Sequence, residues 1–149
     1  MNMMHYEKMD IEILKYEVQK IRNLLENERY NIAIKEYGFT SFPYGCCHPT
    51  SLALGLWLYN IANKKPKIQC VTGKNANEKW HAWLEYNDLI IDITADQFNE
   101  IKDKVMIIPK SSELHNSYKY ERKYQIINES ILTGQAESEV YKILTKCLL

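Results

Sequence analysis

Residues 42–60 read FPYGCCHPTSLALGLWLYN, a loop that turns into an apolar helix at two adjacent cysteines. A proline and a glycine mark the loop, and Pro49 occupies a first-turn position in which proline is tolerated. Leucine and aromatic residues then recur at helical spacing, which predicts a buried helix over residues 48–62. Cys46 and Cys47 therefore lie at the junction between the loop and the helix.

The start of a helix favours the ionised form of a cysteine. The first backbone N–H groups of a helix have no intrahelical partner and, together with the helix dipole, stabilise a thiolate over a thiol. Cys47 is therefore a candidate nucleophile, with Cys46 as its competitor. Free cysteine is also among the most buried residue types, so the alternative is that both thiols fill the junction as small apolar side chains.

The rest of the chain predicts an α+β fold. Apolar residues three and four positions apart predict an amphipathic helix from Asp10 to about Tyr37, ending at Gly38. After the second helix, segments rich in β-branched and aromatic residues predict strands, and a last helix closes the chain. In order, these are KIQCVTG (67–73), KWHAWLEY (79–86), LIIDIT (89–94), KVMIIP (104–109), SYKYERKYQI (117–126) and the helical ESEVYKILTKCLL (137–149).

Composition bounds the functional classes. The 149 residues are expected to form one domain, with a helical segment over residues 1–38. Nineteen basic and nineteen acidic residues give no net field that would attract nucleic acid or an anionic membrane. No apolar run approaches the roughly 20 residues needed to cross a bilayer, and the N-terminal stretch lacks the apolar core of a secretory signal. Because four cysteines also make a poor disulfide framework, we expect a cytoplasmic protein. The sequence leaves its oligomeric state open.

A second group of chemically capable residues lies in the segment WHAWLEYNDLIIDIT. Asn-Asp at 87–88 predicts a two-residue hairpin turn, and side chains two apart on a strand share a face. His81 and Asp92 then become diagonal neighbours with Cα atoms roughly 7–8 Å apart, within reach of a hydrogen bond. The expected register pairs Tyr86 with Leu89, Glu85 with Ile90, Leu84 with Ile91, Trp83 with Asp92 and His81 with Thr94.

A thiol at a helix start, an imidazole base and a carboxylate that orients the imidazole are the parts of an activated-nucleophile site. The series FPYGCC, HAWLE and IDITADQF, within residues 42–98, resembles the papain-like and transglutaminase-like cysteine enzyme superfamily, including the small bacterial transglutaminase-like proteins. In that superfamily a Gly-x-Cys step opens a central helix that packs on an antiparallel sheet. The resemblance implies Cys47 as nucleophile, His81 as general base and Asp92 as orienting acid, with no metal and no cofactor.

The function implied is acyl transfer from an amide or thioester bond of a protein or peptide, as in a peptidase, a deamidase or a transglutaminase-type enzyme. One alternative is a non-catalytic binding or inhibitory module on the same fold. Another is a zinc site built from Cys46, Cys47, His48 and His81, although adjacent ligands fit a zinc tetrahedron badly.

The groups that would hold the oxyanion form a further expectation. Papain-like sites usually carry a glutamine upstream of the cysteine to hold the oxyanion, and the loop EYGFTSFPYG has none. The backbone N–H of Cys47 would supply one oxyanion donor, with Gln19, Tyr37 or Tyr44 as candidates for a second. Gln97 is expected to hydrogen-bond to backbone.

Aromatic and histidine residues complete the expectations. Trp83 falls on the face of His81 and could shield it from water, whereas Trp80 is expected in the core. His5 and His115 are expected to be solvated. Alternate tyrosines share one side of the last predicted strand and would line a cleft or mark a half-buried edge strand; these are Tyr118, Tyr120 and Tyr124.

Overall fold

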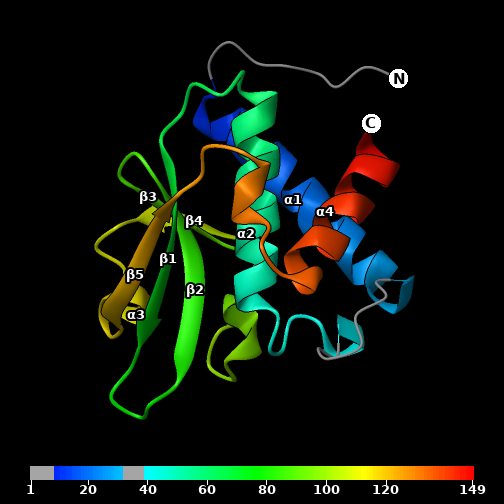
Figure 1. Ribbon diagram of the computed structural model, residues 1–149. Helices are drawn as coiled ribbons and strands as arrows, with labels where there is room; N and C mark the ends of the chain where they lie inside the picture. Colours follow the sequence, from blue (N-terminus) through cyan, green and yellow to red (C-terminus); the bar gives the residue numbers. More distant parts are fainter. Residues whose placement is uncertain (1–8, 32–38) are drawn as a thin grey trace.

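The computed structural model describes residues 9–31 and 39–149. An antiparallel sheet with the strand order β4-β3-β2-β1-β5 carries three long helices on one face (Figure 1). The predicted α+β class, the strands and the closing helix are confirmed. The elements are α1 (Ile11–Glu28), α2 (Cys47–Ile61), β1 (Ile68–Lys74), β2 (Trp80–Tyr86), β3 (Leu89–Asp92), β4 (Met106–Pro109), α3 (Glu113–Asn116), β5 (Lys119–Gln125) and α4 (Gln135–Leu148).

Helix α1 begins where the sequence predicts and ends earlier. Asp10 caps it, because its carboxylate accepts a hydrogen bond from the Ile13 N–H at 2.9 Å. The buried stripe ends at Leu25, and the α-helix gives way to a single 3₁₀ turn after Glu28. The end expected near Tyr37 is therefore wrong for the α-helix, and residues 32–38 lie outside the described part.

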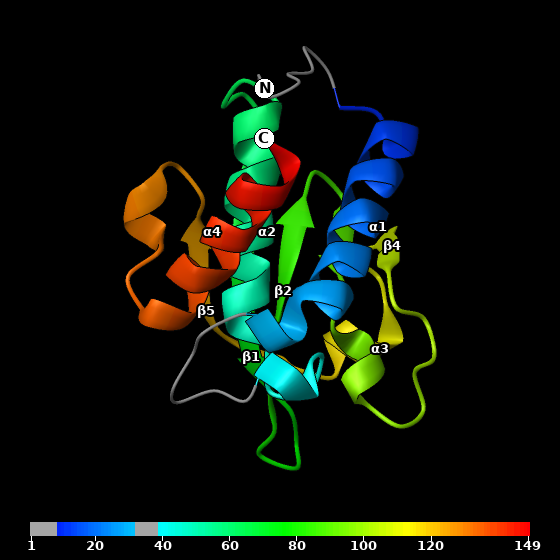
Figure 2. The ribbon, with the colours of Figure 1, turned by 90° about the vertical axis from the view of Figure 1, so that its right-hand side faces the viewer.

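Helix α2 is buried along most of its length, between the sheet on one side and α1 and α4 on the other (Figure 2). Gly55 lets it approach the sheet closely. A Cβ atom at that position would lie 2.9 Å from Ile126 Cδ1 and 3.0 Å from Leu84 Cδ2. The middle of α2 therefore packs closely against the sheet.

The hairpin has the predicted register. Tyr86 pairs with Leu89, and the next two pairs follow in step as expected. Because β3 ends at Asp92, the half of β2 that carries His81 extends beyond its neighbour. On its other side β2 pairs with β1 along its whole length, and Gly73 lies opposite His81.

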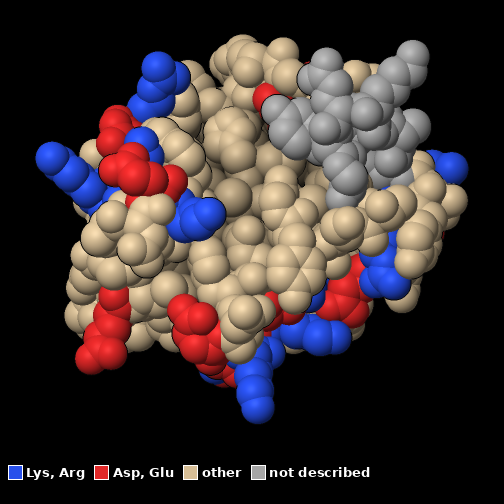
Figure 3. All heavy atoms as spheres, turned by 90° about the horizontal axis from the view of Figure 1, so that it is seen from below, with Lys and Arg blue, Asp and Glu red and all other residues tan. Residues whose placement is uncertain are grey.

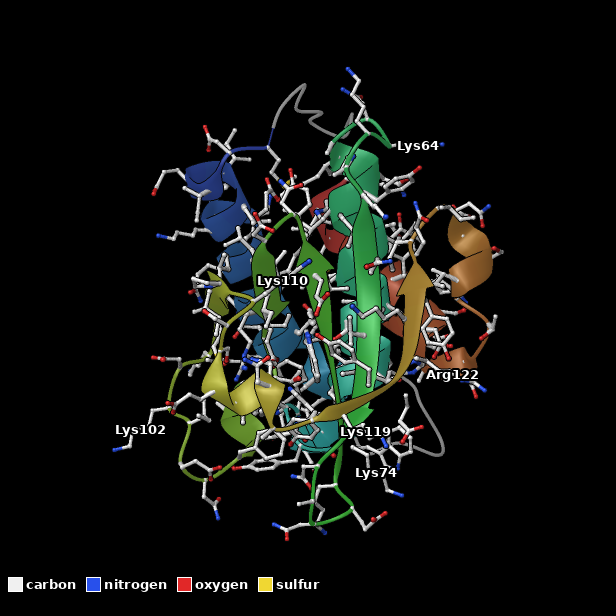
Figure 4. The ribbon with its side chains drawn as sticks, turned by 90° about the vertical axis from the view of Figure 1, so that its left-hand side faces the viewer. Lys64, Lys74, Lys102, Lys110, Lys119 and Arg122 are labelled. Carbon is white, nitrogen blue, oxygen red and sulfur yellow. The ribbon has the colours of Figure 1, made fainter. Side chains whose placement is uncertain are left out.

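Apolar side chains fill both faces of the sheet. The larger core lies under α1, α2 and α4. A smaller cluster lies on the opposite face, which Figure 4 views, where α3 covers part of the sheet. Its buried members are Val71, Trp83, Ile90 and Tyr118. Farther along this face Lys110 extends toward the buried Glu85, with its Nζ atom 3.7 Å from the carboxylate.

Strand β5 is an edge strand, as predicted, but its tyrosines do not share one face. A bulge between Thr72 and Gly73 in the pairing of β1 with β5 shifts the register. Because β5 has one extra residue at the bulge, the side chains beyond it point to the opposite face of the sheet. Tyr120 packs near Trp83, while Tyr124 packs near His48 of α2. The strict alternation expected for this strand is therefore wrong.

A buried arginine joins α1 to the chain that follows β3. Arg22 is 2% exposed and forms a two-pronged pair with Asp96, with both N–O distances 2.7 Å. The same guanidinium donates to the carbonyl of Ile93 at 2.6 Å. Helix α1 therefore holds the segment that leaves Asp92. Within residues 9–31 and 39–149, no helix is long and apolar enough to cross a membrane.

Candidate active site

The two adjacent cysteines have different environments. Cys46 is the N-cap of α2, is 1% exposed, and donates its thiol to the Tyr44 carbonyl at 3.3 Å. Burial, with a smaller effect from its neighbour, raises the pKa of Cys46 to about 12. Cys47 is the first residue of the helix, is half-buried and lines a cleft. Cys46 therefore fills the junction, and Cys47 is the thiol that a ligand can reach.

The turn before the helix depends on Gly45. Its φ of +70° lies in the left-handed region, which favours glycine. A Cβ atom added at this position would have no neighbouring atom within 4 Å, so the backbone alone accounts for the glycine. This turn directs the chain into α2 two residues before Cys47.

The cleft at the start of α2 has a volume of about 500 Å³. Figure 3 views the molecule from this end, and the middle of the face carries uncharged side chains, with charged ones mostly toward its margins. The lining comes from α2, β1, β2 and β5, and includes Cys47, His48, Trp80, His81, Arg122 and Tyr124. Trp80 is 55% exposed, so its expected place in the core is wrong.

His81 and Asp92 form the predicted pair. His81 Nε2 lies 2.6 Å from Asp92 Oδ2, and the two residues are each 1% exposed. The other carboxylate oxygen accepts the Thr94 N–H at 2.9 Å. Because a carboxylate can only accept, Nε2 of His81 carries a proton, and Nδ1 is the atom left to exchange protons with Cys47.

The contact between His81 and Asp92 shifts the pKa of both side chains. Burial disfavours the charged imidazolium, but the charge and hydrogen bond of Asp92, with smaller effects from Cys47, raise the pKa of His81 to about 10. Burial also disfavours the Asp92 carboxylate, yet His81 and His115 together hold the pKa of Asp92 well below its usual range. The pair therefore favours the charged imidazolium form of His81.

The expectation that His115 is solvated is wrong. His115 lies on α3, is 2% exposed, and its Nε2 is 2.7 Å from the same Asp92 Oδ2 that binds His81. Its Nδ1 lies 2.8 Å from the hydroxyl of Ser112. Two imidazoles therefore converge on one carboxylate oxygen. His5 lies outside the described residues.

Gln97 also has a partner other than the one expected. Its Nε2 lies 3.1 Å from His81 Nδ1, whereas a bond to backbone was predicted. Trp83 is fully buried, with its ring centroid 5.7 Å from that of His81 and 4.9 Å from that of His115. It covers the two imidazoles from the interior of the protein.

The oxyanion candidates can be compared with these positions. The side chain of Cys46, which is the N-cap of α2, accepts no capping hydrogen bond, so the first-turn N–H groups have no side-chain acceptor there. Gln19 lies on α1, donates to Asn23 at 3.0 Å and lines a different hollow. Tyr44 is 57% exposed and is not among the residues that line the cleft. Tyr37 lies outside the described residues.

A metal ion is the alternative use of such a cluster. In the described part of the chain, one group of three metal-capable side chains comes together, and it consists of His81, Asp92 and His115, with ligand atoms within 4.8 Å of one another. The alternative zinc set of Cys46, Cys47, His48 and His81 is not among the groups found in that part of the chain. Ligands about 2.1 Å from a tetrahedral zinc lie about 3.4 Å apart. Distances of 2.6 and 2.7 Å to one oxygen are those of hydrogen bonds.

Comparison of the chain with protein-family models, with curated proteins and with solved structures gave no match.

Proposed function

We propose that the protein is a cysteine-dependent acyl-transfer enzyme that acts on an amide or thioester bond of a protein or peptide. The observation that carries this proposal is the convergence of Cys47, at the start of α2, with the His81–Asp92 pair at one cleft. A thiol, an imidazolium and a buried carboxylate in series are what such a reaction requires.

In the first half-reaction the Cys47 thiolate attacks the carbonyl carbon, and a C–S bond forms. His81 donates its Nδ1 proton to the leaving nitrogen or sulfur as the C–N or C–S bond of the substrate breaks. Water or an amine then attacks the acyl-enzyme, His81 takes up its proton, and the thiolate is released. Asp92 remains ionised and orients the ring throughout.

The resemblance to the papain-like and transglutaminase-like superfamily agrees with this assignment. A central helix that begins at the cysteine and packs on an antiparallel sheet is the core that the resemblance implies. The first-turn N–H groups of α2 are the best-placed oxyanion donors. Free thiols at all four cysteines fit a reducing compartment such as the cytoplasm.

The exposed Trp80, with Tyr124 and Arg122 across the cleft, suits an extended peptide that offers apolar and polar groups in turn. Arg122 reaches the cleft from the edge strand β5 (Figure 4) and donates to the Tyr124 hydroxyl at 2.9 Å. A non-catalytic module that binds the same peptide is the second candidate, because this cleft would serve either use.

The test is the pH dependence of alkylation by iodoacetamide, with each labelled cysteine located by mass spectrometry. Cys147 is exposed and provides an ordinary thiol in the same molecule for comparison. We expect Cys47 to react at least tenfold faster than Cys147 at pH 6, where an unperturbed thiol with a pKa of about 8.5 is almost fully protonated. The variant Cys46→Ala should keep this reactivity.

The second arm of the test uses a peptide thioester as acyl donor and a primary amine as acceptor. An adduct on Cys47 in the wild type, and its absence in Cys47→Ala, would support acyl transfer. If Cys47 reacts no faster than Cys147 at any pH, the binding module becomes the better interpretation. If Cys46→Ala abolishes the labelling, the nucleophile is Cys46.

A further inference from the structure

We propose that His115 is a positioning residue that holds the Asp92 carboxylate in place and limits how strongly it binds the His81 imidazolium. The proposal rests on the function proposed for Cys47, His81 and Asp92. It concerns a residue whose sequence context gives no sign of this part, and it starts from hydrogen-bond geometry around one buried carboxylate.

Every accepting position of that carboxylate has a donor. Oδ2 receives the ring nitrogens of His81 at 2.6 Å and His115 at 2.7 Å. Oδ1 receives the backbone N–H of Thr94 at 2.9 Å and its hydroxyl at 3.4 Å. A carboxylate held on both oxygens cannot rotate without breaking a buried hydrogen bond. Its direction toward His81 is therefore fixed.

The hydrogen-bond partners of His115 determine which of its ring nitrogens carries the proton. Nε2 must carry a proton, because Asp92 only accepts. In the neutral ring Nδ1 is then an acceptor, and the Ser112 hydroxyl, 2.8 Å away, is its donor. Ser112 also caps α3 by accepting the His115 N–H. The residue that starts the short helix thus also supports the tautomer that Asp92 requires.

A neutral donor on Oδ2 has a second effect. It takes part of the negative charge that would otherwise act on His81 alone, and it adds no second positive charge to a site whose two ring centroids are 6.0 Å apart. The balance matters because His81 must release its proton to the leaving group as well as hold it. An imidazolium held too tightly would be a poor acid.

The groups that face the two rings come from each neighbouring element. Cys47 approaches His81 from α2, and Gln97 reaches its Nδ1 from the turn after β3. Trp83 of β2 packs on both rings, and Tyr118, just before β5, packs on His81 with ring centroids 5.8 Å apart. Of these, Cys47 and Tyr118 are titratable.

The first measurement needs no variant. The chain has four histidines, so ¹⁵N-histidine NMR can resolve each ring and report its tautomer and titration. We expect the His115 ring to carry a proton on Nε2, and the signals of this ring should disappear in His115→Gln. Finding His115 protonated on Nδ1 alone would overturn the proposal, since Nε2 could not then donate to Asp92.

The second measurement compares two substitutions. Gln can present its Nε2–H close to where the imidazole does, whereas Leu cannot donate. We expect Cys47 alkylation at pH 6 to stay within about threefold of the wild type in His115→Gln and to fall about tenfold or more in His115→Leu. The titration of the His81 ring should move in His115→Leu and stay near that of the wild type in His115→Gln.

Control variants separate this role from a purely structural one. Ser112→Ala keeps the imidazole and its hydrogen bond to Asp92 and removes only the Nδ1 donor, so His115 should keep its Nε2 proton, which can be measured even if His115→Leu does not fold. Equal losses in His115→Gln and His115→Leu, with unchanged His81 signals in folded protein, would mean that His115 only fills space. If wild-type Cys47 shows no enhanced reactivity, the proposed enzyme function fails, but the tautomer and the His81 titration still decide the part played by His115.

Discussion

His81 and Asp92 form a hydrogen bond of 2.6 Å between two side chains that are closed off from solvent. A buried ion pair costs desolvation on both sides, and only good geometry with further hydrogen bonds offsets that cost. Here the carboxylate has four donors, which supply such hydrogen bonds on its side of the pair. The pair therefore links the protonation of the site to the stability of the fold.

The first prediction concerns stability against pH. The pKa of His81 is raised in the folded protein to about 10, from an unfolded value of about 6.5. Its contribution is complete below pH 6.5 and is lost as pH rises toward 10. We expect the free energy of unfolding to fall by about 1–2 kcal/mol between pH 6.5 and 8, as measured by urea denaturation. Asp92→Asn should remove this dependence.

The chosen pH range and the Asp92→Asn variant separate the effect of His81 on stability from the effects of other titratable groups. Burial raises the pKa of Cys46 and Cys70, and this adds a similar loss of stability only above about pH 8.5, where unfolded thiols ionise. Burial lowers the pKa of His48, which acts in the opposite direction but equally in both proteins. A wild-type slope no steeper than that of Asp92→Asn would contradict the ion pair.

Local patterns made much of this site predictable. The turn dipeptide and the alternation of side chains between the two faces of a strand predict the hairpin register. That register places His81 close to Asp92. A loop followed by an apolar run located the start of α2 within one residue. These features depend on residues close together in the sequence, for which spacing alone carries the geometry.

The features that were missed depend on tertiary structure. His115 lies on a helix of four residues, too short for any periodic signal, and reaches Asp92 only because the chain folds back between β4 and β5. The apolar neighbours Leu114 and Tyr118 were the available hint that this segment is covered. The bulge that separates the tyrosines of β5 has no sequence mark beyond Gly73.

The second prediction concerns Arg22, which ties α1 to the segment after Asp92. Replacing Arg22 with Met leaves Asp96 and the Ile93 carbonyl without their buried donor. We expect a loss of about 3–5 kcal/mol in the free energy of unfolding, because one partner of a largely buried pair remains. Lys15→Met on the same helix removes an exposed pair with Glu12 and should change stability by less than about 1 kcal/mol. Equal losses in the free energy of unfolding in the two variants would contradict the conclusion that Arg22 holds this segment to α1.

The third prediction separates hydrogen bonding from metal binding at the histidine pair. The short distances to Asp92 Oδ2 require protons where a metal would lie. Dialysis against EDTA should therefore leave Cys47 alkylation and the melting temperature unchanged, and elemental analysis should find well under one zinc per chain. A stoichiometric metal whose removal lowers the melting temperature would replace the hydrogen-bonded network with a metal site.

The fourth prediction tests the turn that leads to Cys47. Gly45 has a φ of +70°, and no atom lies within 4 Å of a Cβ built there, so a substitution meets backbone strain and no clash. Asn tolerates this conformation, whereas a β-branched residue does not. We expect Gly45→Val to cost about 1–2 kcal/mol of stability and to slow Cys47 alkylation relative to Cys147, with Gly45→Asn much nearer the wild type. Similar alkylation ratios in the two variants would mean that the turn does not position the thiol.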